Sequence, residues 1–235
     1  MRTILLIIAT IFTAVQLSAQ EIPSTTSGPI KQGLTRFSKI DVDAPIKLTL
    51  IEISENEIPY IVYDTKEVYT SKFSFEVDKN GVLKIRERND PKRESITEVQ
   101  VYYNFLEDIN IAKADVVAES VIDAPLLDIY ISNDSHFVAD VETLDVCVYA
   151  SGKCSIIITG EARYQTVDVS TAEYNASKLE TVSTVASSSH NAVVKVNASE
   201  RLEAKTSTGG KVLYATEPVI LRSAITLFGG EIKLL

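Results

Sequence analysis

The second half of the chain repeats one pattern of hydrophobic and polar positions about six times, between residues 126 and 235. Each copy has an alternating apolar run, a small polar turn and a second alternating run. Alternation with a period of two residues is typical of half-buried β-strands. A recurrence of roughly 20 residues is the signature of a repeat architecture. The pattern therefore predicts a β-solenoid, in which each repeat forms one coil that stacks on the next.

The repeats also predict which side chains point inward. Their apolar runs begin at Leu127, Leu144, Val167, Val182, Leu202 and Ala224. We expect inward ladders formed by Leu127/Ile129/Ile131, by Leu144/Val146/Val148 and by Val212/Tyr214. The intervening turns are rich in Ser, Thr, Gly and Asn, which accept the backbone conformations of tight corners.

The first half of the chain also alternates, but its turn chemistry differs. Strands are expected around residues 37–42, 46–53, 58–63, 73–77, 82–85, 98–103 and 108–112. Asn80-Gly81 between two of them is a strong signal for an antiparallel hairpin. No segment shows a persuasive helical period. We predict an all-β fold, a right-handed parallel β-helix with an N-terminal β region that contains this hairpin and covers one end of the coils. A β-sandwich built from the same strands is the competing fold.

The N-terminus predicts export. Residues 1–19 have a basic start at Arg2, an apolar stretch and small residues before Gln20, which is the pattern of a cleaved signal peptide. An uncleaved anchor is the alternative. Residues 20–35, rich in Ser, Thr, Pro and Gly, are expected to form a flexible leader. The domain then spans residues 36–235, with an N-terminal region at 36–112 and repeats at 113–235. After cleavage we expect no transmembrane segment, and a location in the periplasm, at the cell surface or outside the cell.

The net charge of the chain restricts the classes of partner that we expect it to bind. The formal charge is −9, and removal of Arg2 with the signal segment makes it −10. A negative surplus repels phosphate backbones and anionic membrane surfaces. Nucleic acid is therefore not an expected partner.

The two cysteines do not form a disulfide framework. If the alternation holds, Cys147 points outward while Cys154 shares the inward direction of Ile156 and Ile158. Opposed side-chain directions argue against a bridge between them. We predict two free thiols.

Stacking of the repeats suggests one acidic column. The residue after the first apolar position of each repeat is, in order, Asp128, Asp145, Asp168, Ser183, Glu203 and Arg222. Carboxylates of Asp128, Asp145 and Asp168 about 5 Å apart would repel one another or recruit a cation such as Ca²⁺. They could instead act as paired carboxylates on a polysaccharide. The third interpretation is a solvated face. Because these three interpretations remain open, we assign no catalytic residue and no cofactor, and calcium is kept only as a candidate.

Aromatic side chains give a second candidate site. Tyr130 and Tyr149 occupy similar places in neighbouring repeats, and with Asp145 they are the candidate ligand-binding residues. Tyr102, Tyr103 and Tyr164 could also stack on sugar rings, although tyrosines on a sheet are ordinary cross-strand packing residues. The chain has no Trp. His136 and His190 lie in or beside turns without a nearby Cys or His, so polar turn roles are expected for them.

Short motifs carry a family resemblance. They are Phe37-Ser-Lys-Ile-Asp-Val-Asp, Asn80-Gly-Val-Leu-Lys-Ile, Ser151-Gly, Gly209-Gly-Lys-Val and Gly229-Gly-Glu-Ile. Over about residues 34–235 the chain resembles the putative autotransporter adhesin head domain, or GIN domain, family of exported Bacteroidetes proteins. The resemblance implies a right-handed parallel β-helix, export, and no established activity. Several repeats depart from the family pattern because they lack the Ser-Gly turn.

Two functions from different classes follow. The first is a non-enzymatic binding or structural module of the cell envelope, adhesin-like, which recognises glycan or protein along a long face. The second is a carbohydrate-active enzyme, a polysaccharide lyase or hydrolase, that uses the Asp column. Binding of a lipid or another apolar ligand would require a cavity. The apolar C-terminal segment 231–235 is in addition a candidate for self-association into a homo-oligomer.

Overall fold

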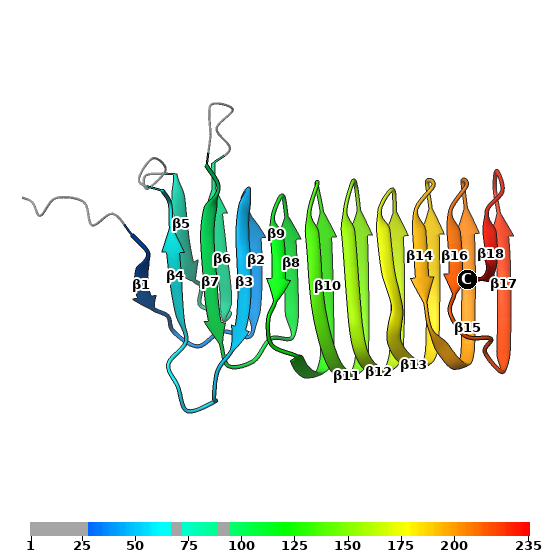
Figure 1. Ribbon diagram of the computed structural model, residues 1–235, viewed down its shortest axis with the longest axis horizontal. Coiled ribbons are helices and arrows are strands. Elements are labelled where there is room, and N and C mark those ends of the chain that lie inside the picture. Colours follow the sequence, from blue (N-terminus) through cyan, green and yellow to red (C-terminus); the bar gives the residue numbers. More distant parts are fainter. Residues whose placement is uncertain (1–27, 67–71, 89–94) are drawn as a thin grey trace, which may run out of the picture.

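The computed structural model describes residues 28–66, 72–88 and 95–235, and these residues form strands and turns without a helix. The 18 strands belong to one continuous hydrogen-bonded system. Figure 1 shows them stacked side by side along the long axis of the molecule, each strand perpendicular to that axis. The all-β prediction and the β-solenoid are therefore confirmed, and the sandwich is not formed.

Each coil contributes one strand to each of two opposed sheets. The first sheet contains β5 (Phe73–Val77), β6 (Val82–Glu87), β2 (Lys39–Asp43), β8 (Asp108–Ala112) and β17 (Ile220–Thr226). The second sheet contains β1 (Ile30–Gly33), β4 (Tyr60–Asp64), β7 (Thr97–Tyr103), β3 (Ile46–Glu52), β9 (Asp115–Ala118), β14 (Val193–Val196), β16 (Lys211–Tyr214) and β18 (Glu231–Leu234).

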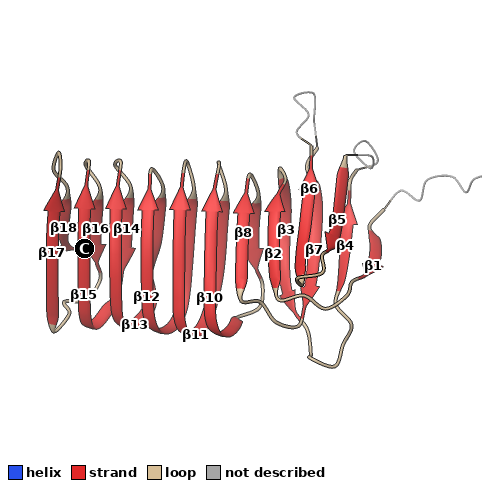
Figure 2. Ribbon diagram, turned by 180° about the vertical axis from the view of Figure 1, so that it is seen from behind, coloured by secondary structure: helices blue, strands red, loops and turns tan. Residues whose placement is uncertain are grey.

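Five longer strands lie in the repeat region. They are β10 (Ile122–Ser132), β11 (His136–Ser151), β12 (Ser155–Ser170), β13 (Glu173–Ser189) and β15 (Ala198–Ser207). At the lower end of the coils in Figure 1, β11, β12 and β13 bend from the second sheet into the first without ending. The view from behind shows the coils following one another along the same axis (Figure 2). All of these strands pair in parallel with their neighbours.

The N-terminal coils are not stacked in sequence order. The β2–β3 coil lies between the β6–β7 coil and the β8–β9 coil. Strand β4 runs antiparallel to β7, β1 runs antiparallel to β4, and β5 runs antiparallel to β6. This arrangement covers one end of the solenoid with reversed strands, as the sequence predicts. Covering an end limits the exposure of unpaired strand edges.

The predicted hairpin is present between β5 and β6. Asp78 Oδ1 accepts hydrogen bonds from the backbone N–H of Asn80 (2.8 Å) and of Val82 (3.1 Å). Gly81 takes the left-handed conformation with φ 72°, which glycine adopts without steric cost.

The core consists of aliphatic columns that run the length of the stack. One column joins Ile109, Ile129, Val148, Val167, Ala186 and Ala204, which are at most 4% exposed. The inward positions of Leu127, Ile129, Ile131, Val146, Val148, Val212 and Tyr214 are confirmed. Parallel strands in register place equivalent side chains above one another, so each coil contributes to one shared interior.

Leu144 is an exception to the predicted ladder. It is 57% exposed, whereas the alternation predicts an inward side chain. The pairs Ala124–Thr143 and Leu126–Asp145 flank it, at the place where β11 bends between the two sheets. The bend interrupts the simple alternation at this position.

The leader is shorter than the sequence suggests. Residues 30–33, inside the predicted leader 20–35, form β1 and pair with β4. The predicted signal peptide, residues 1–19, and the rest of the leader up to residue 27 lie outside the described residues. Among the residues that are described, no helix is long and apolar enough to cross a membrane.

Candidate functional site

The outer surface of the first sheet carries a polar and aromatic column, which we call the tyrosine column. Register places its members on successive coils in the order Asp41, Asn110, Tyr130, Tyr149, Asp168, Ser187 and Lys205. These residues come from segments far apart in the sequence. Only the in-register stacking of the coils brings them into one line.

Tyr130 and Tyr149 form an exposed aromatic pair at the middle of this column. Their ring centroids lie 5.1 Å apart and their planes differ by 11°. This separation is close to the spacing of neighbouring strands, about 4.8 Å, so the rings stack along the long axis of the solenoid. The side chains remain 41% and 39% exposed. The predicted correspondence of these two tyrosines is therefore confirmed.

On the side away from the stack, each ring has a non-aromatic neighbour in the column. The next residue of the column beyond Tyr130 is Asn110, and the next beyond Tyr149 is Asp168. Both are short polar side chains that do not fill the space an aromatic ring would occupy. The surface forms a groove of about 310 Å³ here, lined by Asn110, both tyrosines, Asp168 and Ser170 among others. The arrangement offers flat apolar ring surfaces beside amide and carboxylate groups that can form hydrogen bonds.

The three aspartates do not form the predicted column. Asp128 pairs with Cys147, Asp145 pairs with Tyr164, and Asp168 pairs with Tyr149. They thus lie in three different columns of the first sheet. The error is a slip of two residues, which preserves the inside and outside alternation and so leaves no trace in the hydrophobic pattern. Asp128, Glu203 and Arg222 do share one column, as the pattern predicts.

The predicted calcium site is not assembled in the described part of the chain. Among the described residues, no group of three or more His, Cys, Asp or Glu side chains is arranged to hold a metal ion. The cation site predicted for Asp128, Asp145 and Asp168 required these residues to share one column. The register places them in three columns, so this requirement is not met.

The aspartates nevertheless make the surface beside the tyrosine column electrostatically negative. Burial raises the pKa of Asp145, and the charge of Asp128 raises it further. Burial also raises the pKa of Asp108, with Asp128 and Glu107 adding to the rise and Lys39 opposing it. The Lys39 Nζ lies 3.7 Å from Asp108 Oδ2.

The same negative charges contribute to raised pKa values of the two tyrosine hydroxyls. Burial and the charge of Asp128 raise the pKa of Tyr130. The pKa of Tyr149 is raised by Cys147 first and then by burial and by the neighbouring aspartates. Both phenols are therefore neutral hydrogen-bonding groups near pH 7.

The cysteines point as the sequence predicts, and both are free thiols. Cys154 is buried, and its Sγ donates to the carbonyl of Ser151 at 3.1 Å. Cys147 is half-buried on the outer surface between Asp128 and Thr166 in its column. Burial raises the pKa of both thiols, and Asp145 and Asp128 add to the rise at Cys147. A thiol with a raised pKa is a poor nucleophile at neutral pH.

The other predicted aromatic residues do not extend the site. Tyr103 is buried, with 1% exposure, and Tyr102 stacks on Tyr60 with ring centroids 4.1 Å apart. Tyr164 is 47% exposed and lies in the column of Asp145, where Arg163 sits 5.6 Å above its ring.

One histidine lies beside a turn and the other lies in one, as the sequence predicts. His136 follows the turn before β11, and its Nδ1 lies 3.1 Å from the carbonyl oxygen of Ser155. His190 has a left-handed backbone, φ 52°, and its Nδ1 lies 3.2 Å from the Ser170 hydroxyl.

A genuine carboxylate column exists on the opposite sheet, and the sequence interpretation misses it. We call it the acidic ladder: Asp123, Glu142, Glu161 and Glu180 pair with one another in register on successive coils. All four side chains are exposed. They line a groove of about 730 Å³ that also includes Leu144 and Arg163. The available signal was the constant interval of 19 residues between the four acids.

The chain belongs to the family described as "Putative auto-transporter adhesin, head GIN domain", whose model matches residues 36–218. This finding agrees with the coiled architecture and with the resemblance noted in the sequence. No curated protein matches the chain.

Solved structures of similar proteins show the same fold. A putative adhesin from Bacteroides fragilis is 16% identical, with a TM-score of 0.75 over 88% of this chain and 96% of that one. A putative adhesin from Parabacteroides merdae is 14% identical, with a TM-score of 0.69 over 88% and 95%. A putative lipid-binding protein from Parabacteroides distasonis is 14% identical, with a TM-score of 0.64 over 88% and 96%.

Proposed function

We propose that this protein is an exported, non-enzymatic binding module of the cell envelope that recognises glycan through the groove at Tyr130 and Tyr149. The observation that carries the proposal is the stacked, exposed tyrosine pair between Asn110 and Asp168 in one column. Membership of an adhesin family and a fold shared with proteins named putative adhesins support a binding role.

The chemistry of the groove suits a sugar. The ring faces of Tyr130 and Tyr149 on the side away from the stack can lie against the C–H face of a pyranose, because aromatic side chains present large apolar areas with a polar tip. The amide of Asn110 and the carboxylate of Asp168 can bond to hydroxyl groups at either end of the pair. Recognition would thus use both stacking and hydrogen bonds, as is usual for small polar ligands.

The alternative of a carbohydrate-active enzyme is not carried forward. It rested on paired carboxylates of Asp128, Asp145 and Asp168 in one column, and these residues lie in three columns. An enzyme needs catalytic groups at fixed separation around one bound substrate.

The test is a glycan-array screen with the chain lacking residues 1–19, followed by calorimetry on any ligand found. We expect Tyr130→Ala/Tyr149→Ala to weaken binding at least tenfold, about 1.4 kcal/mol. Tyr164→Ala is the matched control, because Tyr164 is an exposed tyrosine of the same sheet outside the column. Equal binding by the double variant and the wild type would overturn the proposal, as would the absence of any glycan ligand.

A further inference from the structure

The last coil of the described structure is open on its outer side. Register assigns Leu221, Ile225 and Leu234 to the interior, above Leu202, Thr206 and Tyr214 of the preceding coil. Those three lower residues are 0%, 0% and 8% exposed. The three residues of the last coil are instead 41%, 57% and 48% exposed. Side chains in core positions are therefore half in water at this end.

The backbone of the same coil is also incomplete. Within the described residues, β17 pairs only with β15 and β18 pairs only with β16, so the outer edge of each strand lacks a partner. The opposite end of the solenoid is covered by the antiparallel strands β1, β4 and β5. The two ends of the described stack thus differ: reversed strands form one end, whereas two strands parallel to their neighbours, β17 and β18, form the other (Figure 1).

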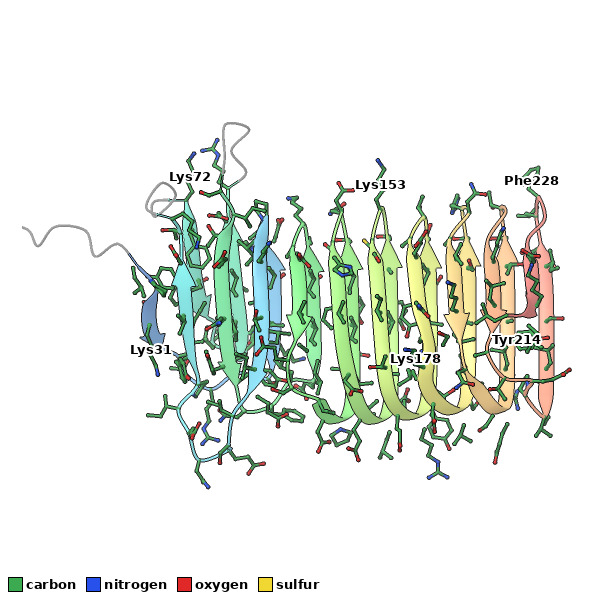
Figure 3. The ribbon with its side chains drawn as sticks, in the orientation of Figure 1. Lys31, Lys72, Lys153, Lys178, Tyr214 and Phe228 are labelled. Atoms are coloured by element: carbon green, nitrogen blue, oxygen red, sulfur yellow. The ribbon has the colours of Figure 1, made fainter. Side chains whose placement is uncertain are left out.

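The rim of the open coil is apolar too. Leu227 is 73% exposed and Phe228 is 89% exposed in the turn that follows β17, and Val219 is 83% exposed just before the strand begins. Figure 3 shows Phe228 at the extreme end of the molecule, on the turn. Exposed apolar patches with unpaired strand edges are typical of association sites.

We propose that this open coil docks against the same coil of a second copy of the chain, with β17 antiparallel to β17 about a two-fold axis through Ser223. The inference concerns assembly and is independent of the glycan proposal. A two-fold interface uses the same patch on both copies, so the patch must complement itself.

The sequence of β17 meets that condition. Pairing centred on Ser223 places Leu221 of one copy opposite Ile225 of the other, twice, and overlaps all seven residues of the strand. It places Arg222 opposite Ala224, whereas a centre on Arg222 would bring two like charges together. Continued beyond the strand, the same centre brings Leu227 of one copy toward Val219 of the other. A slip by one residue would turn the core side chains outward.

The geometry joins the two interiors into one. Because the axis passes through the first sheet, each sheet of one copy continues into the same sheet of the other, and the exposed core positions cover each other. The tyrosine columns of both copies then lie on one side of the dimer. If those columns bind glycan as proposed above, the dimer is bivalent, which raises apparent affinity for a repeating polymer.

The first test is the oligomeric state of the chain without residues 1–19, measured by size-exclusion chromatography with light scattering. We expect a dimer, and we expect Leu221→Lys/Ile225→Lys to give a monomer with an unchanged circular-dichroism spectrum. Leu144→Lys is the control: Leu144 is 57% exposed but lies on a bend far from the open coil, so this variant should remain dimeric.

The second test does not depend on how the lysine variant folds. In a Cys147→Ser background, Ser223→Cys should form a disulfide between copies under mild oxidation, because directly opposed residues of antiparallel strands bring Cα atoms within disulfide range. Lys153→Cys, on a turn away from the open end, should not cross-link (Figure 3). A monomer at about 100 μM, no 223–223 bond, or an open series of larger assemblies would each overturn the two-fold proposal.

Discussion

The Nε2 of Gln165 donates a hydrogen bond to the Oη of Tyr174 at 2.6 Å inside the solenoid, where each side chain is 1% exposed. The Oε1 of Gln165 in turn accepts from Thr184 Oγ1 at 3.2 Å. The hydroxyl oxygen of Thr184 also lies 2.8 Å from that of Thr181, and the Thr181 hydroxyl donates to the carbonyl of Asn197 at 2.7 Å. A connected polar network therefore interrupts the aliphatic interior, and every member has a partner.

Removing the Tyr174 hydroxyl should be costly. Tyr174→Phe leaves a buried amide donor on Gln165 without a partner, and such a group costs about 1–3 kcal/mol of stability. Urea unfolding at equilibrium measures the change. The triple variant Gln165→Leu/Thr184→Val/Tyr174→Phe replaces the network with apolar groups and should cost less than the single change. A single variant as stable as the wild type would contradict the account.

Gly160→Ala should destabilise the fold strongly. Gly160 has φ 106°, and a Cβ there would lie 2.1 Å from the carbonyl oxygen of Val141 and 2.4 Å from Asp140 Oδ1. The backbone oxygen belongs to the neighbouring coil and cannot move without breaking the ladder. We expect a loss of several kcal/mol in thermal or urea unfolding. Gly33→Ala is the control, because a Cβ at Gly33 meets no atom within 4 Å and should change stability by less than about 1 kcal/mol.

The hairpin turn at Asp78 should contribute to acid sensitivity. The Lys84 ammonium and the backbone N–H of Val82 hold the pKa of Asp78 below its usual value. A carboxyl whose pKa is lower in the folded state stabilises the fold above its unfolded pKa, and this contribution disappears as pH falls through the folded pKa. Asp78→Asn should therefore lower the melting temperature at pH 7 and have little effect near pH 2. A difference that is equal at both pH values would exclude the charge as its origin.

Neutralising one member of the acidic ladder should stabilise the protein. Glu161 stands between Glu142 and Glu180 in register, and like charges directly opposite on neighbouring strands are unfavourable by about 0.2–1 kcal/mol. Glu161→Gln should raise the melting temperature at low ionic strength, and the gain should shrink in about 1 M salt because of screening. Glu200→Gln, an exposed change outside the ladder, should not show this salt dependence. The same gain at both salt concentrations would argue against charge repulsion.

Cys147 should be slow to alkylate at neutral pH. Burial raises the pKa of its thiol, and Asp145 is the next cause. In a Cys154→Ser background, the rate of reaction with iodoacetamide should rise as pH increases through that raised pKa. Asp145→Asn removes one of the charges that oppose thiolate formation, so this variant should react faster at a given pH. A rate that does not respond to Asp145→Asn would show that the charge of Asp145 does not contribute to the raised pKa.

The sequence was sufficient to predict the class of fold, because alternation decides which side chains of a strand face the core. Leu127, Ile129 and Ile131 are buried as that rule requires. The Asn80-Gly81 signal likewise identified the hairpin, since its turn chemistry is local. Both predictions depend only on residues near one another in the chain.

Register could not be predicted in the same way. Moving a repeat by two residues leaves every inward side chain inward, so the hydrophobic pattern alone does not distinguish Asp128 opposite Asp145 from Asp128 opposite Cys147. The interval of 19 residues between Tyr130 and Tyr149 was the signal that favoured the second pairing. The strand bend at Leu144 adds to the difficulty, since it exposes a leucine that the alternation assigns to the core. The prediction of the candidate site was therefore only partly correct. Tyr130 and Tyr149 pair as predicted, whereas the three aspartates lie in separate columns and the acidic ladder lies on the other sheet.

The stacking of coils along one axis has a mechanical consequence. The hydrogen bonds between coils run along the long axis of the molecule, so a pull between its two ends loads the coils in series (Figure 1). Coils can then detach one at a time instead of sharing the load. Asp128, Cys147 and Thr166 show that one coil holds 19 residues, which extend to about 60 Å when freed. Under tension the solenoid would lengthen in discrete steps and absorb work at each one.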